Sequence, residues 1–424
     1  MTDDIGRMKT AGSRLTFKAN RDLGRHGWLR LTPAYSVHLV ARYAAALGPA
    51  DRVLDPFCGT GTTALVCRER GIYCDTVDIN PFLIWLANAK CAAYAEQDVV
   101  DARALIEDGI GRAPQADDWT PPLFNIGRWW GPETLARLAS VRRSLTEARV
   151  SDRARDLAKV AFCRSAIEIS NASHGHQSLS FKSDIAYQNE VTVATDASNT
   201  IDRIALAESL RRAIESVGAS ATARGPFGEG RALLGDARDL RAATADESGG
   251  NGNSGYSAVI TSPPYPNRMS YVRELRPYMY WLGFLGSGRE AGELDWRAIG
   301  GTWGIATSNV ARWRPDPGME TTADVGETIA RIGARSEVLG RYVEKYVHDT
   351  QAHVLSLRAV LAPGARLTYI VGNSRFFDVT LSTEEIYAAI FQASGFRDVG
   401  IETLRKRTSK KELFEFAVTA TWPG

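Results

Sequence analysis

The stretch VLDPFCGTGTT, residues 53–63, decides how this chain folds. Its first residues are apolar and predict a buried strand, which the acidic Asp55 follows directly. Gly59 and Gly61 then form a loop in which the backbone can approach a ligand closely, because glycine has no Cβ. A strand that leads into such a loop is typical of a nucleotide-type cofactor site, although an ordinary strand-to-helix turn has the same pattern.

A second motif, VITSPPYPN at residues 259–267, places prolines and an aromatic ring directly after another strand. Proline fixes φ and donates no N–H, so Pro263 and Pro264 predict a rigid turn whose neighbouring carbonyls accept hydrogen bonds. Alone, the motif is equally typical of a structural turn or a polyproline ligand. Its place after a strand, behind the glycine loop in the chain, favours a catalytic turn.

The residue types of this turn suit the activation of an exocyclic amino group on a base. Such a nitrogen is a poor nucleophile, because its lone pair is delocalised into the ring. If the Ser262 hydroxyl and the Pro263 carbonyl orient its hydrogens, the nitrogen can pyramidalise toward a methyl donor, and positioning does most of the catalysis. Tyr265 would stack on the base, which must leave a duplex to reach it. No covalent intermediate is needed.

At these residues the chain resembles the bacterial DNA amino-methyltransferases, the family that makes N4-methylcytosine and N6-methyladenine. DPFCGTG is similar to their cofactor motif and TSPPY to their catalytic motif, and the serine-headed form is more typical of the N4-cytosine members. The resemblance implies an α/β fold, a Rossmann-like seven-stranded sheet that is mostly parallel with a C-terminal β-hairpin. It also implies S-adenosylmethionine as cofactor and direct in-line transfer to N4 of a cytosine flipped out of double-stranded DNA.

The resemblance further implies which residues bind the cofactor. Residues 31–47 would cover its methionine end, Asp78 would meet the ribose hydroxyls, and Asp236 would meet the adenine amino group. The expected cofactor residues are Thr32, Pro33, Asp55, Pro56, Phe57, Cys58, Gly59, Gly61, Thr62, Asp78, Ile79, Asn80, Asp236 and Ala237. The expected catalytic residues are Ser262, Pro263, Pro264 and Tyr265.

Composition sets limits on the class of protein. With 424 residues, the chain can form one domain with large insertions or two domains. A hydrophobic share of 44% with no run long enough to span a bilayer, and no signal-peptide core at the N-terminus, predicts a cytoplasmic protein without membrane contact. The net charge of +2 requires any DNA-binding face to come from local clustering. No CxxC or HExxH motif occurs, so neither a metal nor a disulfide framework is expected.

Strand and helix alternate around the cofactor motif, as a parallel sheet with helices on both faces requires. We expect residues 1–90 to form the first part of the methyltransferase domain, residues 91–231 a mainly helical insertion, and residues 232–424 the remainder. In this last part, we expect a core-packing helix at residues 271–285. A second, irregular insertion is expected at about 286–325, and a long amphipathic helix at 338–361. Ser382 and Glu385 predict a capping box at the start of a helix. The closing strands are expected at residues 401–407 and 412–422.

Sequence recognition must come from elements added to the sheet, and the two insertions are the candidates. The longer one interrupts the cofactor half, which departs from the usual placement of a recognition domain between or after the two halves. Its segment SHGHQSLSFK, residues 173–182, is equally typical of a solvated loop. The expected DNA-binding residues are His174, His176, Lys182, Arg268, Arg273, Arg407 and Lys410. Residue types do not decide whether the chain has a cognate restriction or defence system as a partner.

Three alternatives stay open. The target can be N6 of adenine, for which Asp or Asn heads the motif more often than Ser. The polymer can be RNA or a protein glutamine, although the glutamine enzymes usually show NPPY and no added RNA-binding module is visible. The chain can also be a non-catalytic nucleic-acid-binding protein, against which the intact TSPPY argues.

Overall fold

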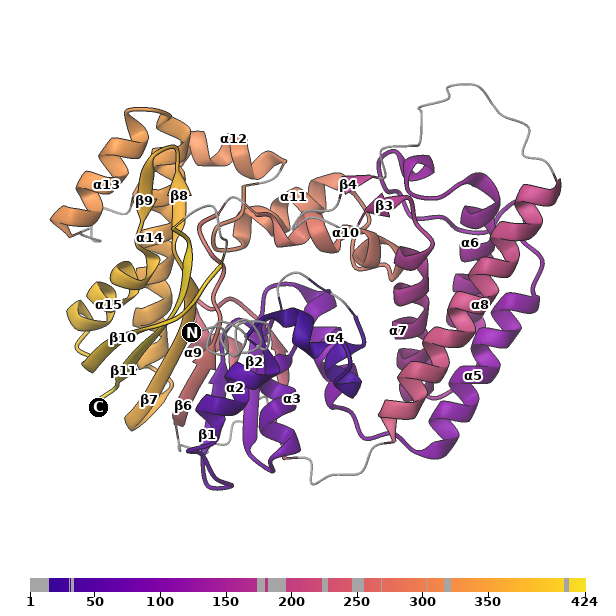
Figure 1. Ribbon diagram of the computed structural model, residues 1–424, viewed down its shortest axis with the longest axis horizontal. Coiled ribbons are helices and arrows are strands. Elements are labelled where there is room, and N and C mark those ends of the chain that lie inside the picture. Colours follow the sequence, from indigo (N-terminus) through magenta and orange to yellow (C-terminus); the bar gives the residue numbers. More distant parts are fainter. Residues whose placement is uncertain are drawn as a thin grey trace, which may run out of the picture.

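The computed structural model describes residues 15–29, 31, 34–173, 180–181, 196–222, 228–245, 255–267, 269–302, 304–315, 322–407 and 412–424 (Figure 1). Its main sheet has seven strands in the order β10-β11-β7-β6-β1-β2-β5. The bounds are β1 Arg52–Asp55, β2 Tyr73–Asp78, β5 Ala232–Leu234, β6 Tyr256–Thr261, β7 Leu361–Gly372, β10 Arg397–Lys406 and β11 Phe414–Thr421.

The strand directions confirm the predicted fold class. Every pair from β7 through β6, β1 and β2 to β5 is parallel, whereas β11 runs antiparallel to both β7 and β10. The chain therefore forms a mostly parallel, Rossmann-like sheet that ends in an antiparallel hairpin. From β1 the chain builds outward through β2 to β5, and from β6 it builds outward the other way through β7. The boundary between β1 and β6 is thus a topological switch point, where open α/β sheets bind ligands at the carboxyl ends of their strands.

Helices cover both faces of the sheet, because successive strand residues point to opposite sides. On one face, Leu54 and Val259 belong to an apolar cluster with side chains of α14 Glu337–Arg358 and α15 Thr383–Ala393. On the other, Ile260 and Ile370 pack with α2 Val37–Ala44 and with α3 Thr62–Glu69. The remaining elements near the sheet are η1 Phe17–Asn20, η2 Gly24–Gly27, α4 Pro81–Cys91, β8 Ser374–Phe376, β9 Val379–Leu381 and α9 Leu240–Ala243.

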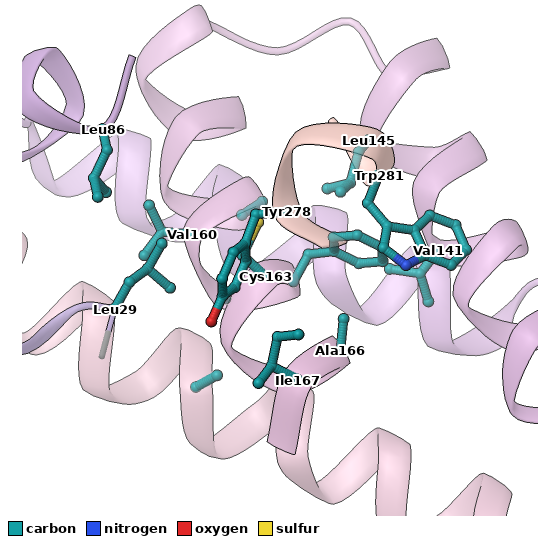
Figure 2. Packing of buried hydrophobic residues seen from close by; sticks show 14 of the residues in the cluster. Leu29, Leu86, Val141, Leu145, Val160, Cys163, Ala166, Ile167, Tyr278 and Trp281 are labelled. Atoms are coloured by element: carbon teal, nitrogen blue, oxygen red, sulfur yellow. The ribbon is translucent and has the colours of Figure 1, made fainter. Parts of the chain in front are cut away.

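The region predicted to be a helical insertion is mainly helical. It holds α5 Glu96–Gly111, η3 Ile126–Arg128, α6 Pro132–Glu147, α7 Asp152–Glu168, β3 Ala172–Ser173, β4 Ser180–Phe181 and α8 Asp196–Ala221. Figure 2 shows that its core also takes in residues from outside the insertion: Leu86 of α4, and Tyr278 and Trp281 of α10 Tyr271–Trp281, lie among Val160 and Cys163 of α7. The insertion and the helix after the catalytic motif therefore share one apolar core.

Two expectations about local structure are wrong. The segment expected to be irregular contains α11 Gly288–Arg297 and α12 Ile305–Arg312, and leads into α13 Ala323–Gly333. Positive φ angles at Gly300 and Gly304 separate the short helices, which hides their periodicity in the sequence. Ser382 is the N-cap of α15, but its hydroxyl makes no capping hydrogen bond, so the helix start is correct and the capping box is not formed.

No helix in the described ranges combines the length and apolar character that a membrane span requires.

Candidate active site

The cofactor motif and the catalytic motif leave the sheet side by side. β1 ends at Asp55 and β6 ends at Thr261, and these neighbouring parallel strands place both ends at the same edge of the sheet. The Thr261 hydroxyl donates a 2.6 Å hydrogen bond to Oδ1 of Asp55, and both residues are fully buried. The two motifs, distant in the chain, are thus joined directly at the switch point.

The glycine loop is held by the end of β2. The Cys58 N–H donates to the Val77 carbonyl at 2.8 Å, and the Gly59 N–H donates to Oδ2 of Asp78 at 3.0 Å. Gly61 has φ of +73°, and a Cβ there would lie 2.9 Å from the Cβ of Ala87. The loop therefore needs glycine at position 61 both for its backbone conformation and for its close approach to α4.

Asp78 combines a structural role with free acceptor capacity. Its Oδ1 accepts from the Asn80 N–H at 2.9 Å while Oδ2 accepts from Gly59, and each carboxylate oxygen has a second lone pair. The side chain is only half-buried, so those lone pairs are accessible. Burial raises the pKa of Asp78 to about 6 and that of Asp55 to about 7. Asn80 in turn caps α4, accepting from the Phe82 N–H at 3.0 Å.

Asp236 follows β5 at the same edge of the sheet, and its carboxylate binds Arg238. The guanidinium donates from Nε to Oδ1 at 3.0 Å and from Nη2 to Oδ2 at 2.7 Å. Burial acts to raise the pKa of Asp236, but the hydrogen bonds from Arg238 outweigh it, so the pKa is lowered. Arg238 also pairs with Asp349 of α14 at 2.8 Å. Much of the acceptor capacity of Asp236 is therefore already used within the protein.

The catalytic turn presents acceptors at its tip. The Ser262 hydroxyl donates to the Ile370 carbonyl of β7 at 3.0 Å, which leaves the lone pairs of its oxygen available. The Pro264 carbonyl accepts from the Tyr346 hydroxyl of α14 at 3.0 Å. Within the described ranges, no donor reaches the Pro263 carbonyl. Ser262 and Pro263 therefore offer two adjacent oxygen acceptors.

Tyr265 is held in place by contacts with the C-terminal hairpin. Its hydroxyl donates to Oε1 of Glu415 at 3.1 Å, and Oε2 of Glu415 pairs with Arg405 at 2.7 Å. The Arg407 guanidinium lies 5.1 Å from the centre of the Tyr265 ring and donates to the Asn373 carbonyl at 2.9 Å. The ring orientation is thus fixed by residues that lie far away in the sequence.

Comparisons with known proteins find short sequence matches to methyltransferases. The chain is 35% identical over 69 residues to the Type II methyltransferase M.BsoBI of Geobacillus stearothermophilus, a match that covers 16% of this chain and 14% of the relative. It is 26% identical over 95 residues to the Type II methyltransferase M.AvaI of Nostoc sp. and to that of Anabaena variabilis, covering 22% of this chain and 17% of each relative. The chain is related to the DNA methyltransferase family.

This relationship confirms the resemblance predicted from the sequence. The matched segments span less than a fifth of the length of these relatives. No protein-family profile matches the chain. Among solved structures, the rRNA methyltransferase aviRa from Streptomyces viridochromogenes aligns over 92% of this chain and 86% of its own, at 15% identity and a TM-score of 0.27.

The structure brings together most of the residues of this chain that were predicted to bind the cofactor. Asp55, Cys58, Gly61 and Asp78 with their neighbours line one loop and the two strand ends beside it, and Ala237 lies at the end of β5. Cys58 is buried and its pKa is raised by that burial, as expected of an unreactive packing residue. Residues 31–47 were predicted to cover the methionine end of the cofactor. One of them, Tyr35, packs beside the glycine loop, because its hydroxyl hydrogen-bonds with that of Thr63 in α3.

Two of the predicted DNA-binding residues, Arg273 and Arg407, are among the described residues, and they lie on different elements. Arg273 is exposed on α10, whereas Arg407 lies against Tyr265 at the catalytic turn. The other predicted site residues lie outside the described residues: Thr32, Pro33, His174, His176, Lys182, Arg268 and Lys410. Among the residues that the structure describes, no cluster of three or more His, Cys, Asp or Glu side chains is arranged to hold a metal.

Sequence reasoning missed a lysine beneath the glycine loop. Lys90 of α4 is 1% exposed, and its ammonium group donates to the Thr60 carbonyl at 2.9 Å. Burial lowers its pKa to about 8. Lysine is almost never fully buried without a partner, so a lysine in the mostly apolar stretch 82–92 was the available signal.

Sequence reasoning also missed His353 of α14. Its Nδ1 lies 2.9 Å from the Ala237 carbonyl and its Nε2 lies 2.7 Å from the Tyr369 hydroxyl. Because a carbonyl only accepts, Nδ1 carries the hydrogen and Nε2 accepts from the tyrosine. Burial lowers the pKa of His353 to about 4, so the ring is neutral near pH 7. The ring meets Phe57 edge-on, with centres 4.7 Å apart, and so fixes the side of the loop that faces β5.

Proposed function

We propose that this chain is a DNA methyltransferase that transfers a methyl group from S-adenosylmethionine to the exocyclic N4 amino group of cytosine. The observation that carries the proposal is the hydrogen bond between Thr261 and Asp55, which joins the strand ends that bear the two motifs. The matches to Type II methyltransferases support the same reaction class. Because those matches are short, the substrate and the partners of the chain are part of the proposal.

The glycine loop and its surroundings fit the cofactor. S-adenosylmethionine supplies an electrophilic methyl group on a positively charged sulfur. Asp78 keeps accessible lone pairs for the ribose hydroxyls, and the absence of a Cβ at Gly59 allows close approach of the backbone. Asp236 retains one lone pair on Oδ2 after binding Arg238, enough for a single donor such as the adenine amino group. The carboxylate of Asp55 and the face of the Phe57 ring favour a cation nearby.

The catalytic turn suits an amino group rather than a carbonyl. Ser262 has its hydrogen directed at Ile370, so the Ser262 oxygen and the Pro263 carbonyl both act as acceptors. Two acceptors bind the two hydrogens of an –NH₂ group and draw its lone pair out of conjugation with the ring. A carbonyl oxygen at that position would meet two acceptors and be rejected. The amino bases cytosine and adenine are therefore preferred, and the serine at the head of the motif favours cytosine.

Tyr265 provides the stacking surface for the flipped base. Its hydroxyl is fixed by Glu415 and its edge lies against Gly372, so the ring holds its orientation before a substrate arrives. A rigid ring reduces the entropy lost on binding. The bound base is thus placed in line with the methyl donor, and positioning lowers the barrier.

The test is methyl transfer with identification of the product. The full chain is incubated with tritiated S-adenosylmethionine and unmethylated duplex DNA, and the DNA is digested to nucleosides for mass spectrometry. We expect N4-methylcytosine. N6-methyladenine as the only product would overturn the choice of base, and transfer to competing RNA alone would overturn the choice of polymer. If the chain binds the cofactor but transfers no methyl group to any nucleic acid, the proposal of an enzyme is wrong.

A further inference from the structure

An array of arginine and aromatic side chains lies where the helical insertion meets α10. The Arg128 guanidinium lies 4.1 Å from the centre of the Phe181 ring, and that ring meets Trp129 at 5.0 Å. From the other side, Arg276 of α10 lies 5.3 Å from the centre of a Trp129 ring. We call these four residues, together with Arg273 on the first turn of α10, the arginine–aromatic ridge. Figure 1 shows β3 and β4 beside α10 at this junction.

The ridge concentrates positive charge at the surface. Arg128 and Arg273 are exposed, and neither forms an ion pair with a described residue. Burial lowers the pKa of Arg276, and the positive charge of Arg273 lowers it further. Like charges three residues apart on a helix repel each other. Several other arginines of the insertion, by contrast, pair with carboxylates, as Arg211 does with Glu107 at 2.7 Å and Arg112 with Glu147 at 2.6 Å.

The ridge is also tied to the catalytic turn. α10 begins at Tyr271, six residues after Tyr265, and its N-cap Ser270 accepts from the Arg273 N–H at 3.0 Å. A guanidinium stacked on a ring keeps the N–H groups of its edge free for the oxygens of a phosphate. A row of guanidinium groups that begins in the first turn of the helix after the catalytic turn fits a polyanion that extends away from the reacting base.

We propose that the arginine–aromatic ridge is the surface through which the helical insertion holds the phosphate backbone of the DNA beside the catalytic turn. The inference rests on the proposed function and adds to it where the duplex lies. The ridge reads charge rather than base identity, because Arg128 and Arg276 lie over aromatic rings and the guanidinium groups of the ridge contact phosphates rather than bases. It therefore contributes affinity that is the same for every DNA sequence.

The test measures DNA binding of the full chain by fluorescence anisotropy over a series of salt concentrations. The variant carries Arg128→Gln and Arg273→Gln, two exposed positions whose change leaves the apolar core intact. The matched control is Arg153→Gln, an exposed arginine without an ion pair to a described residue. Arg153 lies in the first turn of α7, about 25 Å along the helix from the ridge. Cofactor affinity, measured by calorimetry, reports that each variant is folded.

We expect the slope of log K against log salt concentration to become shallower by about 2 in the double variant, about 1 for each phosphate that an arginine no longer neutralises. Affinity should fall equally for unrelated duplex sequences, while the control and the cofactor affinity stay unchanged. A slope equal to that of the control overturns the inference, and so does a weakening confined to one DNA sequence or to RNA. If the wild-type chain methylates DNA and only the ridge prediction fails, the proposed function stands. If the wild-type chain neither binds nor methylates DNA, the proposed function itself fails.

Discussion

The glycine loop and the catalytic turn lie side by side, but they are held in place by different kinds of contact. The Gly59 N–H is fixed by Asp78, 19 residues away, while the hydrogen bonds of the turn span 108 residues from Ser262 to Ile370 and 150 from Tyr265 to Glu415. The backbone of the loop therefore takes its shape mainly from the pairing of β1 with β2, while the Asp55 and Phe57 side chains also have distant partners in Thr261 and His353. The turn takes its shape only when β7, α14 and the C-terminal hairpin are assembled, so distant changes should damage methyl transfer more than cofactor binding.

The sharpest separation of the two regions is expected from Tyr265→Ala. Stacking of a base on an aromatic ring is worth about 1–3 kcal/mol, so we expect kcat/KM for methyl transfer to fall by up to about 100-fold. Cofactor affinity should remain within about twofold of wild type, because none of the contacts of the glycine loop changes. Steady-state transfer assays and calorimetry measure the two quantities. Tyr265→Phe, which keeps the ring and removes the hydroxyl with its contacts to Glu415 and Ser262, should retain most activity. Loss of cofactor binding in Tyr265→Ala would show that the two regions are not separate.

A smaller effect is expected from Gly372→Ala, which acts on the catalytic turn from β7. An added Cβ would lie 2.6 Å from Nη1 of Arg407 and 2.8 Å from Cε2 of Tyr265, so both the guanidinium and the ring must move. We expect methyl transfer to fall about 10-fold at unchanged cofactor affinity, because a small misplacement of a positioning group is costly. The control is Gly326→Ala in α13, where an added Cβ meets nothing within 4 Å. Equal activities of the two variants would contradict the role given to the ring orientation.

The smallest effect is a pH dependence confined to the cofactor side. Burial raises the pKa of Asp55 to about 7 and of Asp78 to about 6, so both carboxyl groups lose their charge as the pH falls through this range. A neutral carboxyl attracts a sulfonium less, so we expect cofactor affinity to fall about threefold between pH 8 and pH 5.5. The Ser262 and Pro263 acceptors do not titrate there, and kcat at saturating cofactor should change less. Calorimetry across this range measures the affinity.

Asp78→Asn is the control for that profile, because it removes the group that titrates near pH 6. Its affinity should be lower at every pH, and its remaining pH dependence should centre near 7, the pKa of Asp55. An affinity that does not vary with pH in the wild type would contradict the assignment of these carboxylates to the cofactor.

Much of the fold could be predicted because its signals are local. The strands at 52–55 and 73–78, the helix after the glycine loop and the closing hairpin each show their pattern within about twenty residues, and all are present in the structure. The helices of residues 288–312 were missed because they are short and separated by glycines with positive φ. The missing hydrogen bond at Ser382 is a choice between alternative partners, which residue types do not reveal.

The candidate site likewise has parts that show a local sequence signal and parts that depend on distant residues. The glycine loop and the acceptors of the catalytic turn could be named from two motifs, since their roles follow from residue type and order. The partners that orient them, Tyr346, His353 and Glu415, come from a helix and a strand far along the chain. Tyr346 and His353 are seven residues apart and so lie on the same face of α14, a spacing that core packing explains equally well. Arg407, which was predicted to bind a phosphate, lies against Tyr265, because β10 returns that residue to the sheet edge; its phosphate role stays a prediction.

The core that the helical insertion shares with α4 and α10 limits how the insertion can be exchanged. Trp281 of α10 meets Trp130 and Phe162 of the insertion edge-on, with ring centres 5.7 Å and 5.5 Å apart. A graft that replaced residues 91–231 alone would leave α10 without its packing partners, and α10 is the helix that begins just beyond the proline turn. Exchanging the insertion for that of another chain would therefore require transplanting α10 together with residues 91–231 as one cassette.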